Sequence, residues 1–397
     1  MNPRDFTEQR WGRLAKTPQD FWAFIPNNLP PDLKLEWPLA MALSEADRAL
    51  ANLAGTARNL RNPHLLIRPF IQREAVLSSR IEGTQASLSD VFFFQAAETP
   101  GEPQKTTSSD VVEVMNYART LEYGMERLST LPLSLRLICE MHEKLLTGVR
   151  GQHQTPGEFR RSQNWIGTPG CTLTEATYVP PPLPEMRDAL DAFEKYLYAP
   201  PDMPPLVRLA LIHYQFEAIH PFLDGNGRIG RLLISLLMRA GGLLPQPLLY
   251  ISAYFERHRQ EYYDHLLAIS QKGHWAAWLG FFLRGVAEQS NDALARINRL
   301  LHLWESYREQ FSAARSTVLI QRLIDALFES PVVTIPRAAR LLGVTYPAAA
   351  THIRNLLNAG ILTEIPERRH PRLFLAEGIL HAIEDPIDEP SIPEKSN

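Results

Sequence analysis

Apolar residues recur at intervals of three and four positions along most of this 397-residue chain. That spacing places the apolar residues on one face of an α-helix and the polar residues on the other. It predicts helices over 38–60, 66–82, 109–128, 132–147, 185–198, 205–219, 228–240 and 276–312. The alternation that is typical of strands is scarce before residue 360, so we expect a mainly α fold.

The composition is that of an ordinary globular protein, with 45% hydrophobic and 21% charged residues. These values exclude a wholly disordered, collagen-like or coiled-coil chain. The length corresponds to two or three domains. A formal net charge of −3 argues against nucleic-acid binding by the whole surface. Binding by a local basic face stays an alternative.

The cysteines and the N-terminus indicate the compartment. Cys139 and Cys171 are too few for a disulfide framework or a Cys-rich zinc site. The N-terminus opens with polar residues and shows no signal peptide. The longest apolar stretch, around 232–238, is too short to span a bilayer. We therefore expect a soluble, cytoplasmic protein with no membrane partner.

The densest polar cluster lies between two apolar helices and reads His-Pro-Phe-Leu-Asp-Gly-Asn-Gly-Arg-Ile-Gly-Arg over residues 220–231. Gly225 and Gly227 allow successive backbone N–H groups to converge into an anion nest. The nest leads into a helix N-terminus, which favours phosphate. Arg228 and Arg231, less than one helical turn apart, add donors for further phosphate oxygens.

Two more side chains complete the chemistry of this segment. Asp224 could hold Mg²⁺, which usually takes one or two carboxylates plus substrate phosphates. His220 is the side chain here that can accept a proton near neutral pH. Together with the nest and the arginines, they indicate attack on a polyphosphate. The alternative is a structural loop with a capping Asp and two solvated arginines.

The segment resembles the signature of the Fic family, His-Pro-Phe-x-Asp/Glu-Gly-Asn-Gly-Arg-x-x-Arg, with every position filled. Most members of this family transfer AMP from ATP to a hydroxyl side chain of a target protein. The resemblance therefore implies a protein adenylyltransferase (AMPylator) that acts on a Ser, Thr or Tyr of a target protein and on itself. Two alternatives stay open, a DNA-binding regulator that mainly modifies itself and a toxin of the same fold.

The resemblance also implies a role for each position of the segment. His220 would deprotonate the target hydroxyl, and Asp224 would bind Mg²⁺ between the α- and β-phosphates of ATP. The backbone and Asn226 would cradle these phosphates, and the two arginines would meet the β- and γ-phosphates. The implied ATP-binding residues are Asp224, Gly225, Asn226, Gly227, Arg228, Ile229, Gly230 and Arg231.

The likeness to the Fic family extends over about residues 10–310. The segment 171–182 is expected to form a small β-hairpin, and its three closing prolines make it an edge strand or a flap. Within it Thr177, Tyr178, Val179 and Pro180 resemble the flap of the family, which aligns the target segment. Tyr262, Tyr263 and Ser270 resemble the wall around the adenine, although many relatives carry Asn at the position of Ser270. The alternative for the two tyrosines is half-buried packing.

A second motif precedes the catalytic segment. Ser78 and Glu82 share one helix face, and Gly83 is a good C-terminal stop. A carboxylate in the last turn faces the negative end of the helix dipole and needs a cation partner. The alternative is a surface Glu at a frayed helix end.

The pattern around Glu82 resembles the inhibitory helix of the Fic family, Ser/Thr-x-x-x-Glu-Gly/Asn. By this likeness Glu82 would pair with Arg231, exclude the γ-phosphate and hold ATP in an unproductive pose. In some relatives the same Glu orients a water that removes AMP, so a de-AMPylating hydrolase is a further alternative.

The last part of the chain has the order helix, helix, helix, hairpin, which is the outline of a winged helix-turn-helix. The start of its recognition helix, 346–352, offers few groups that read bases. We expect structural or protein contacts, including a homodimer, in preference to specific DNA binding. The predicted organisation is 1–108 N-terminal helical region with the inhibitory helix, 109–312 Fic catalytic core, 313–376 winged helix-turn-helix and 377–397 acidic disordered tail.

Overall fold

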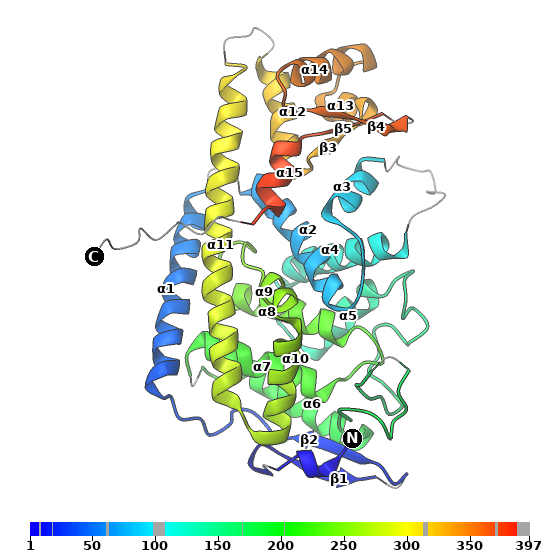
Figure 1. The fold of residues 1–397 in the computed structure, drawn as a ribbon, viewed down its shortest axis with the longest axis vertical. Coiled ribbons are helices and arrows are strands. Elements are labelled where there is room, and N and C mark those ends of the chain that lie inside the picture. Colours follow the sequence, from blue (N-terminus) through cyan, green and yellow to red (C-terminus); the bar gives the residue numbers. More distant parts are fainter. Residues whose placement is uncertain are drawn as a thin grey trace, which may run out of the picture. The chain divides into compact units, whose positions relative to one another are not determined.

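The computed structural model describes the chain except residues 8, 18, 61–62, 98–107, 169, 202, 313–316, 370–371 and 387–397. The described residues are mainly helical (Figure 1), which confirms the mainly α part of the predicted fold class. They form two compact units. The first comprises 1–59, 74–86 and 106–290, and the second 60–73, 87–105 and 291–397. No helix within the described ranges is long and apolar enough to cross a membrane.

The first unit contains most of the predicted helices within a few residues of their expected ends. Its helices are α1 (Trp37–Asn59), α4 (Ser109–Arg127), α5 (Leu135–Leu145), α6 (Leu183–Tyr198), α7 (Pro205–Ile219), α8 (Asn226–Ala240), α9 (Ser252–Arg257) and α10 (Arg259–Lys272). Helices α2 (His64–Ile81) and α11 (Trp275–Glu309) contribute residues to both units. The sequence analysis did not predict α9 and α10.

Helix α7 is the central helix of the first unit. It is apolar around nearly its whole circumference, as expected of a helix that is covered on all sides. It contacts α1, α6, α8 and α10 and the strand β2. Its buried position fixes where the following loop, which begins at His220, leaves the core.

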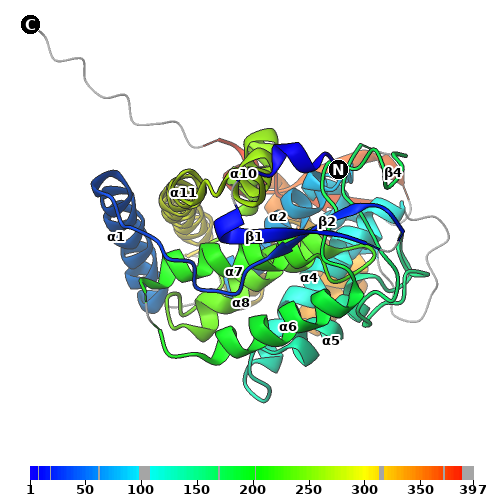
Figure 2. The same ribbon diagram turned by 90° about the horizontal axis from the view of Figure 1, so that it is seen from below.

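A two-stranded antiparallel hairpin near the N-terminus was not predicted. Its strands are β1 (Gly12–Lys16) and β2 (Trp22–Pro26), with Leu14 opposite Phe24. Short 3₁₀ turns, Pro3–Asp5 and Gln9–Trp11, precede it. The hairpin lies beside α6 and α7 (Figure 2). Phe24 is buried in a cluster with Phe6 and Tyr178, so long-range packing stabilises these strands.

The β-hairpin expected over 171–182 does not form, so this prediction is wrong. Its described residues form only one isolated β-bridge, between Ile166 and Tyr178. The N–H of Phe24 donates to the carbonyl of Val179 at 2.9 Å, and the Tyr178 hydroxyl donates to the carbonyl of Ala218 at 2.8 Å. The segment is therefore held by Ile166, by β2 and by the end of α7, and the bridge does not extend into a regular hairpin.

The second unit contains three short strands and several helices. The elements that belong to it alone are α3 (Leu88–Ala97), α12 (Thr317–Glu329), β3 (Val332–Val333), α13 (Ile335–Leu342), α14 (Tyr346–Asn358), β4 (Thr363–Arg369), β5 (Arg372–Leu375) and α15 (Glu377–Glu384). The sheet order is β3-β5-β4, and both pairs are antiparallel. Thr334 caps the start of α13, because its hydroxyl accepts the Arg337 N–H, and Gly343 ends that helix with a left-handed conformation.

The expected disordered tail is wrong for its first residues, which form α15. Ile379, Ala382 and Ile383 share one face of this helix and are buried. The Arg296 guanidinium donates to the carbonyls of Ile383 and Asp385. The apolar face at i, i+3 and i+4 outweighs the acidic composition of the segment. Residues 387–397 of the expected tail lie outside the described residues.

Candidate active site

The loop between α7 and α8 begins and ends at residues with left-handed backbone conformation. His220 has φ of 48° and Gly225 has φ of 81°. Asn226, which begins α8, is buried, and its Oδ1 accepts the Phe222 N–H at 2.9 Å. Its Nδ2 donates to the Phe222 carbonyl at 2.8 Å. Both polar groups of the Asn226 amide therefore hold the loop, and its predicted part in ATP binding stays a prediction.

The imidazole of His220 is oriented as a base. Its Nδ1 lies 3.3 Å from the carbonyl oxygen of Glu217. A carbonyl can only accept, so Nδ1 carries the hydrogen and Nε2 keeps its lone pair. Burial lowers the pKa of His220 to about 4, although the hydrogen bond to Glu217 opposes this shift. The ring is therefore neutral near pH 7 and can accept a proton.

His142, on α5, positions the loop, and the sequence analysis did not single it out. Its Nδ1 accepts the Gly157 N–H at 2.9 Å, so its Nε2 donates to the carbonyl of Asp224 at 2.9 Å. The ring stacks on Phe222 with a centroid distance of 3.7 Å. The signal in the sequence is weak, because one histidine on an apolar helix face usually belongs to the core.

Asp224 presents one carboxylate beside the phosphate-binding backbone. Its Oδ1 accepts the Gly225 N–H at 2.6 Å and lies 3.4 Å from Nη2 of Arg228. Its side chain is 31% exposed. Within the described part of the chain, no three His, Cys, Asp or Glu side chains gather as a metal site. A single accessible carboxylate fits a Mg²⁺ ion that takes its other ligands from substrate phosphates and water.

Arg228 and Arg231 are buried, with side chains 1% exposed. Arg228 forms ion pairs with Asp224 and with Glu113, the latter at 3.5 Å. Nε and Nη1 of Arg228 and Nη1 of Arg231 find no hydrogen-bond partner among the described residues. A buried donor without a partner is costly. These groups are suited to the phosphate oxygens of a ligand.

Arg231 is also held by Ser78 on α2 and by Glu82, the residue that follows α2. Its Nε donates to Oγ of Ser78 at 2.7 Å, and its Nη2 donates to Oε1 of Glu82 at 2.7 Å. Burial alone would raise the pKa of Glu82, but the charge and hydrogen bond of Arg231 lower it below its ordinary value. Glu82 is therefore ionised, and the structure brings together the two residues that the resemblance paired.

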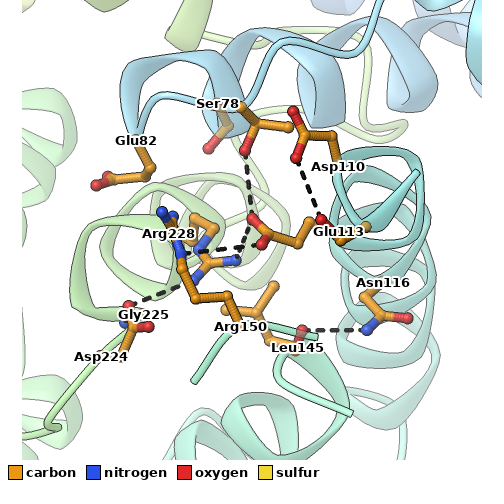
Figure 3. Close-up of polar contacts among 12 residues, drawn as sticks. Ser78, Glu82, Asp110, Glu113, Asn116, Leu145, Arg150, Asp224, Gly225 and Arg228 are labelled. Atoms are coloured by element: carbon orange, nitrogen blue, oxygen red, sulfur yellow. Dashed lines mark hydrogen bonds and ion pairs between the residues drawn. The ribbon is translucent and has the colours of Figure 1, made fainter. Parts of the chain in front are cut away.

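A buried carboxylate near Arg228, that of Glu113 on α4, was not predicted (Figure 3). Its side chain is 4% exposed. Its Oε2 accepts from the Thr84 hydroxyl at 3.3 Å and lies 3.5 Å from Nη1 of Arg228. Arg150 lies 3.9 Å from its Oε1. The sequence hides this residue because its neighbours on α4 follow an ordinary helical pattern.

The residues predicted for the adenine wall point in different directions. Tyr262 is buried, and its hydroxyl lies 2.8 Å from Nε2 of His213. Ser270 is buried, and its hydroxyl lies 2.9 Å from that of Tyr214. Tyr263 is 39% exposed. Only Tyr263 of the three offers an exposed ring, and the hydroxyls of the other two are bound in the helical core.

The residues predicted for the flap also differ in their exposure to solvent. Tyr178, Val179 and Pro180 are buried, and only Thr177 is exposed. The carbonyl of Pro180 accepts from Nε2 of Gln163 at 3.0 Å. Of the four residues predicted for the flap, Thr177 alone is exposed, beside the partly exposed bridge partner Ile166.

Two neighbouring stretches match models of known domains. Residues 40–126 match the Fic/DOC family N-terminal model, and residues 132–238 match the Fic/DOC family model. These two stretches of the chain belong to the Fic/DOC family. The N-terminal Fic/DOC match contains Glu82 and Glu113, and the other contains the whole 220–231 segment.

Curated Fic relatives resemble parts of the chain. The protein adenylyltransferase Fic of Culex quinquefasciatus is 36% identical over 137 residues, which are 34% of this chain and 24% of that protein. That of Drosophila ananassae is 31% identical over 199 residues, which are 48% of this chain and 34% of that protein. The chain thus spans about a quarter to a third of the length of these relatives.

Solved structures show the same Fic fold. A Fic family protein from Desulfovibrio desulfuricans superposes with a TM-score of 0.56 at 18% identity, over 88% of this chain and 98% of that one. Fic-1 from C. elegans superposes with a TM-score of 0.51 at 19% identity, over 66% of this chain and 74% of that one. At these identities the likeness concerns the fold alone.

Proposed function

We propose that this protein transfers AMP from ATP to the hydroxyl of a Ser, Thr or Tyr residue of a target protein, and to itself. The observation that carries the proposal is one loop that joins a neutral His220, an accessible Asp224 and buried guanidinium donors without partners. A base, a single carboxylate and spare anion donors are what transfer from a nucleoside triphosphate needs. The names of the curated relatives support the same activity.

The proposed reaction is a substitution at the α-phosphorus of ATP. Nε2 of His220 takes the proton of the target hydroxyl while the hydroxyl oxygen forms a bond to the α-phosphorus. The bond between that phosphorus and the oxygen bridging to the β-phosphate breaks, and pyrophosphate leaves with the electron pair. Holding the base and the nucleotide in one loop supplies the orientation on which such a transfer depends.

Each charged side chain has a part in this reaction. Asp224 would hold Mg²⁺, which neutralises phosphate charge when it is bound. The N-terminus of α8, after Gly225, presents backbone N–H groups to the nucleotide. Arg228 and Arg231 would bind the outer phosphates through the nitrogens that have no hydrogen-bond partner among the described residues.

We further infer that Glu82 inhibits the enzyme. Its carboxylate takes one of the donors of Arg231, and it lies against Gly227 at the start of α8. A phosphate oxygen directed at Arg231 would meet this negative charge. The γ-phosphate is therefore excluded from its productive position as long as the ion pair persists.

The proposed function is tested by incubating the full chain with MgATP and measuring intact mass and peptide masses. Glu82→Gly is expected to gain AMP adducts at a higher rate than the wild type, because Arg231 becomes free for phosphate. Glu82→Gly combined with His220→Ala has the same opened site without the base and is the matched control. The proposal is wrong if neither the Glu82→Gly protein nor an added proteome gains an adduct that depends on His220.

We propose that 317–375 forms a winged helix-turn-helix that serves protein contacts. The order of its helices and its β3-β5-β4 sheet support this fold. Arg372 is neutralised by a two-point ion pair with Glu364, and Tyr346 at the start of α14 is 54% exposed. An exposed aromatic and a paired arginine favour a protein partner, such as a second copy of the chain, over DNA phosphates. Sedimentation of the full chain and gel shifts at several salt concentrations distinguish these partners.

A further inference from the structure

The inhibitory residue Glu82 stands just beyond the last residue of α2, which ends at Ile81. Its own backbone N–H donates to the carbonyl of Ser79 at 3.0 Å. The next residue, Gly83, has φ of 97° and turns the chain away from the helix axis. A carboxylate at the C-terminal end of a helix is disfavoured by the dipole, and helix ends open readily. The place of Glu82 therefore depends on what holds the turn that follows it.

Helix α4 holds that turn at two points. The N–H of Gln85 donates to Oδ2 of Asp110 at 2.8 Å, and the hydroxyl of Thr84 donates to Oε2 of Glu113 at 3.3 Å. Asp110 and Glu113 are three positions apart and share one face of α4. Figure 3 shows both carboxylates beside the end of α2. We call these two residues the α4 anchor.

We propose that the α4 anchor positions Glu82 in front of Arg231 and so maintains the inhibited state. Both of its hydrogen bonds end on a carboxylate oxygen; the bond from the Gln85 N–H is 2.8 Å long, and that from the Thr84 hydroxyl is longer, at 3.3 Å. Thr84 is buried, so the loss of its partner would leave a hydroxyl unsatisfied. Among the described residues, the hydrogen bonds of Asp110 and Thr84 reach neither Arg231 nor residues 220–231, so we expect both to act through the turn that carries Glu82.

Glu113 gives the anchor a direct connection to the phosphate-binding residues. The same Oε2 that accepts from Thr84 lies 3.5 Å from Nη1 of Arg228. The residues that hold the inhibitory turn and the residues that would bind nucleotide therefore share one carboxylate. A substitution of Glu113 would change both the inhibitory turn and Arg228. The proposal is therefore tested at Thr84 and Asp110.

Thr84→Val removes the hydroxyl without changing the shape of the side chain, and Asp110→Ala removes the acceptor of the Gln85 N–H. Each variant is expected to raise hydrogen exchange of the backbone amides over 80–86 by about tenfold, which is the factor that one hydrogen bond to a charged group represents. Thr120→Val is the matched control, because Thr120 lies on α4 and its buried hydroxyl has no hydrogen-bond partner among the described residues. It should leave exchange over 80–86 unchanged.

The inference rests on the proposed function, and the rate of AMP transfer tests whether the anchor affects that function. Thr84→Val and Asp110→Ala should raise the initial rate of AMP transfer by about tenfold when Glu82 is present. In the Glu82→Gly background both should leave the rate unchanged, since no inhibitory carboxylate is then left to position. A merely structural role of the anchor would lower the rate in both backgrounds.

The outcomes separate the anchor from the activity. Unchanged exchange over 80–86 in both variants, or activation that persists in the Glu82→Gly background, overturns the proposed role of the anchor. Absence of AMP transfer in every variant, Glu82→Gly included, contradicts the proposed function instead. In that case the exchange measurement alone still decides whether Asp110 and Thr84 hold the turn.

Discussion

The carboxylate of Glu82 and the backbone of Gly227 lie so close that no side chain fits between them. A Cβ on Gly227 would stand nearer to Oε1 of Glu82 than real Cβ atoms approach other heavy atoms. Nη1 of Arg231 would lie 3.0 Å from the same Cβ. A side chain at this position of α8 would therefore displace the carboxylate of Glu82.

This contact predicts opposite effects of Gly227→Ala in two backgrounds. With Glu82 present, the methyl group should displace the carboxylate and lower the free energy of unfolding by about 1–3 kcal/mol. In the Glu82→Gly background it should be neutral or stabilise by up to about 1 kcal/mol, because Ala is a better helix former than Gly. Denaturant unfolding of the four proteins gives the coupling energy. Equal effects in both backgrounds would show that the two residues do not interact.

The neutral His220 predicts an unusual pH profile. Its pKa of about 4, against an ordinary value of 6.5, means that the base becomes protonated only in acid. In the Glu82→Gly background kcat/KM for MgATP should therefore stay level as the pH falls from 7 to about 5 and decline only on approach to 4. The profile is measured with a fixed protein target at constant ionic strength. An acid limb centred near 6.5 would contradict the assignment of a buried, neutral base.

Asn226 should contribute mainly to stability of the loop. Asn226→Ala leaves the Phe222 N–H and carbonyl without their partners and is expected to cost about 1–3 kcal/mol of unfolding free energy. Asn226→Asp keeps an acceptor but loses the donor to the carbonyl, so it should be destabilising as well. Asn59→Ala, which removes an exposed hydrogen bond to Gly55, is the control and should cost less than about 0.5 kcal/mol. Thermal unfolding that is unchanged in Asn226→Ala would refute this role.

Glu217 predicts a dependence of stability on pH. Burial raises the pKa of Glu217 to about 8, from an ordinary value of 4.5, although Arg231 lowers it in part. Its Oε1 has no hydrogen-bond partner among the described residues. Between pH 4.5 and 8 the folded state binds the proton that the unfolded state has released, so stability falls as the pH rises through this window.

Glu217→Gln removes this titration. The variant should therefore be more stable than the wild type, and the difference should grow from pH 5 to pH 8 to about 1 kcal/mol or more. Unfolding by urea at several pH values measures it. Glu126→Gln, at an exposed position on α4, is the control for loss of one negative charge. A stability difference that is the same at pH 5 and pH 8 would exclude a protonated Glu217 in the folded protein.

The helices and the catalytic loop could be predicted because their signals are local. The apolar spacing of 205–219 and 228–240 defines α7 and α8, and the loop between them carries its own glycines, base and carboxylate. The pairing of Glu82 with Arg231 was predicted only from the resemblance, because 149 positions separate them. No sequence pattern in α2 or α8 indicates that these two helices pack side by side.

The sequence by itself determined the mainly helical fold and the residues of the 220–231 loop, since periodicity and motif are properties of neighbouring positions. The tertiary structure decided which groups these residues meet. It placed Glu113 beside Arg228, gave the Asn226 amide to Phe222, and replaced the expected flap hairpin with one bridge held by β2. It also formed α15 where an acidic tail was expected. The contacts of Glu113 and of α15 depend on partners brought together by long-range burial, and such partners are not encoded within any single stretch of the chain.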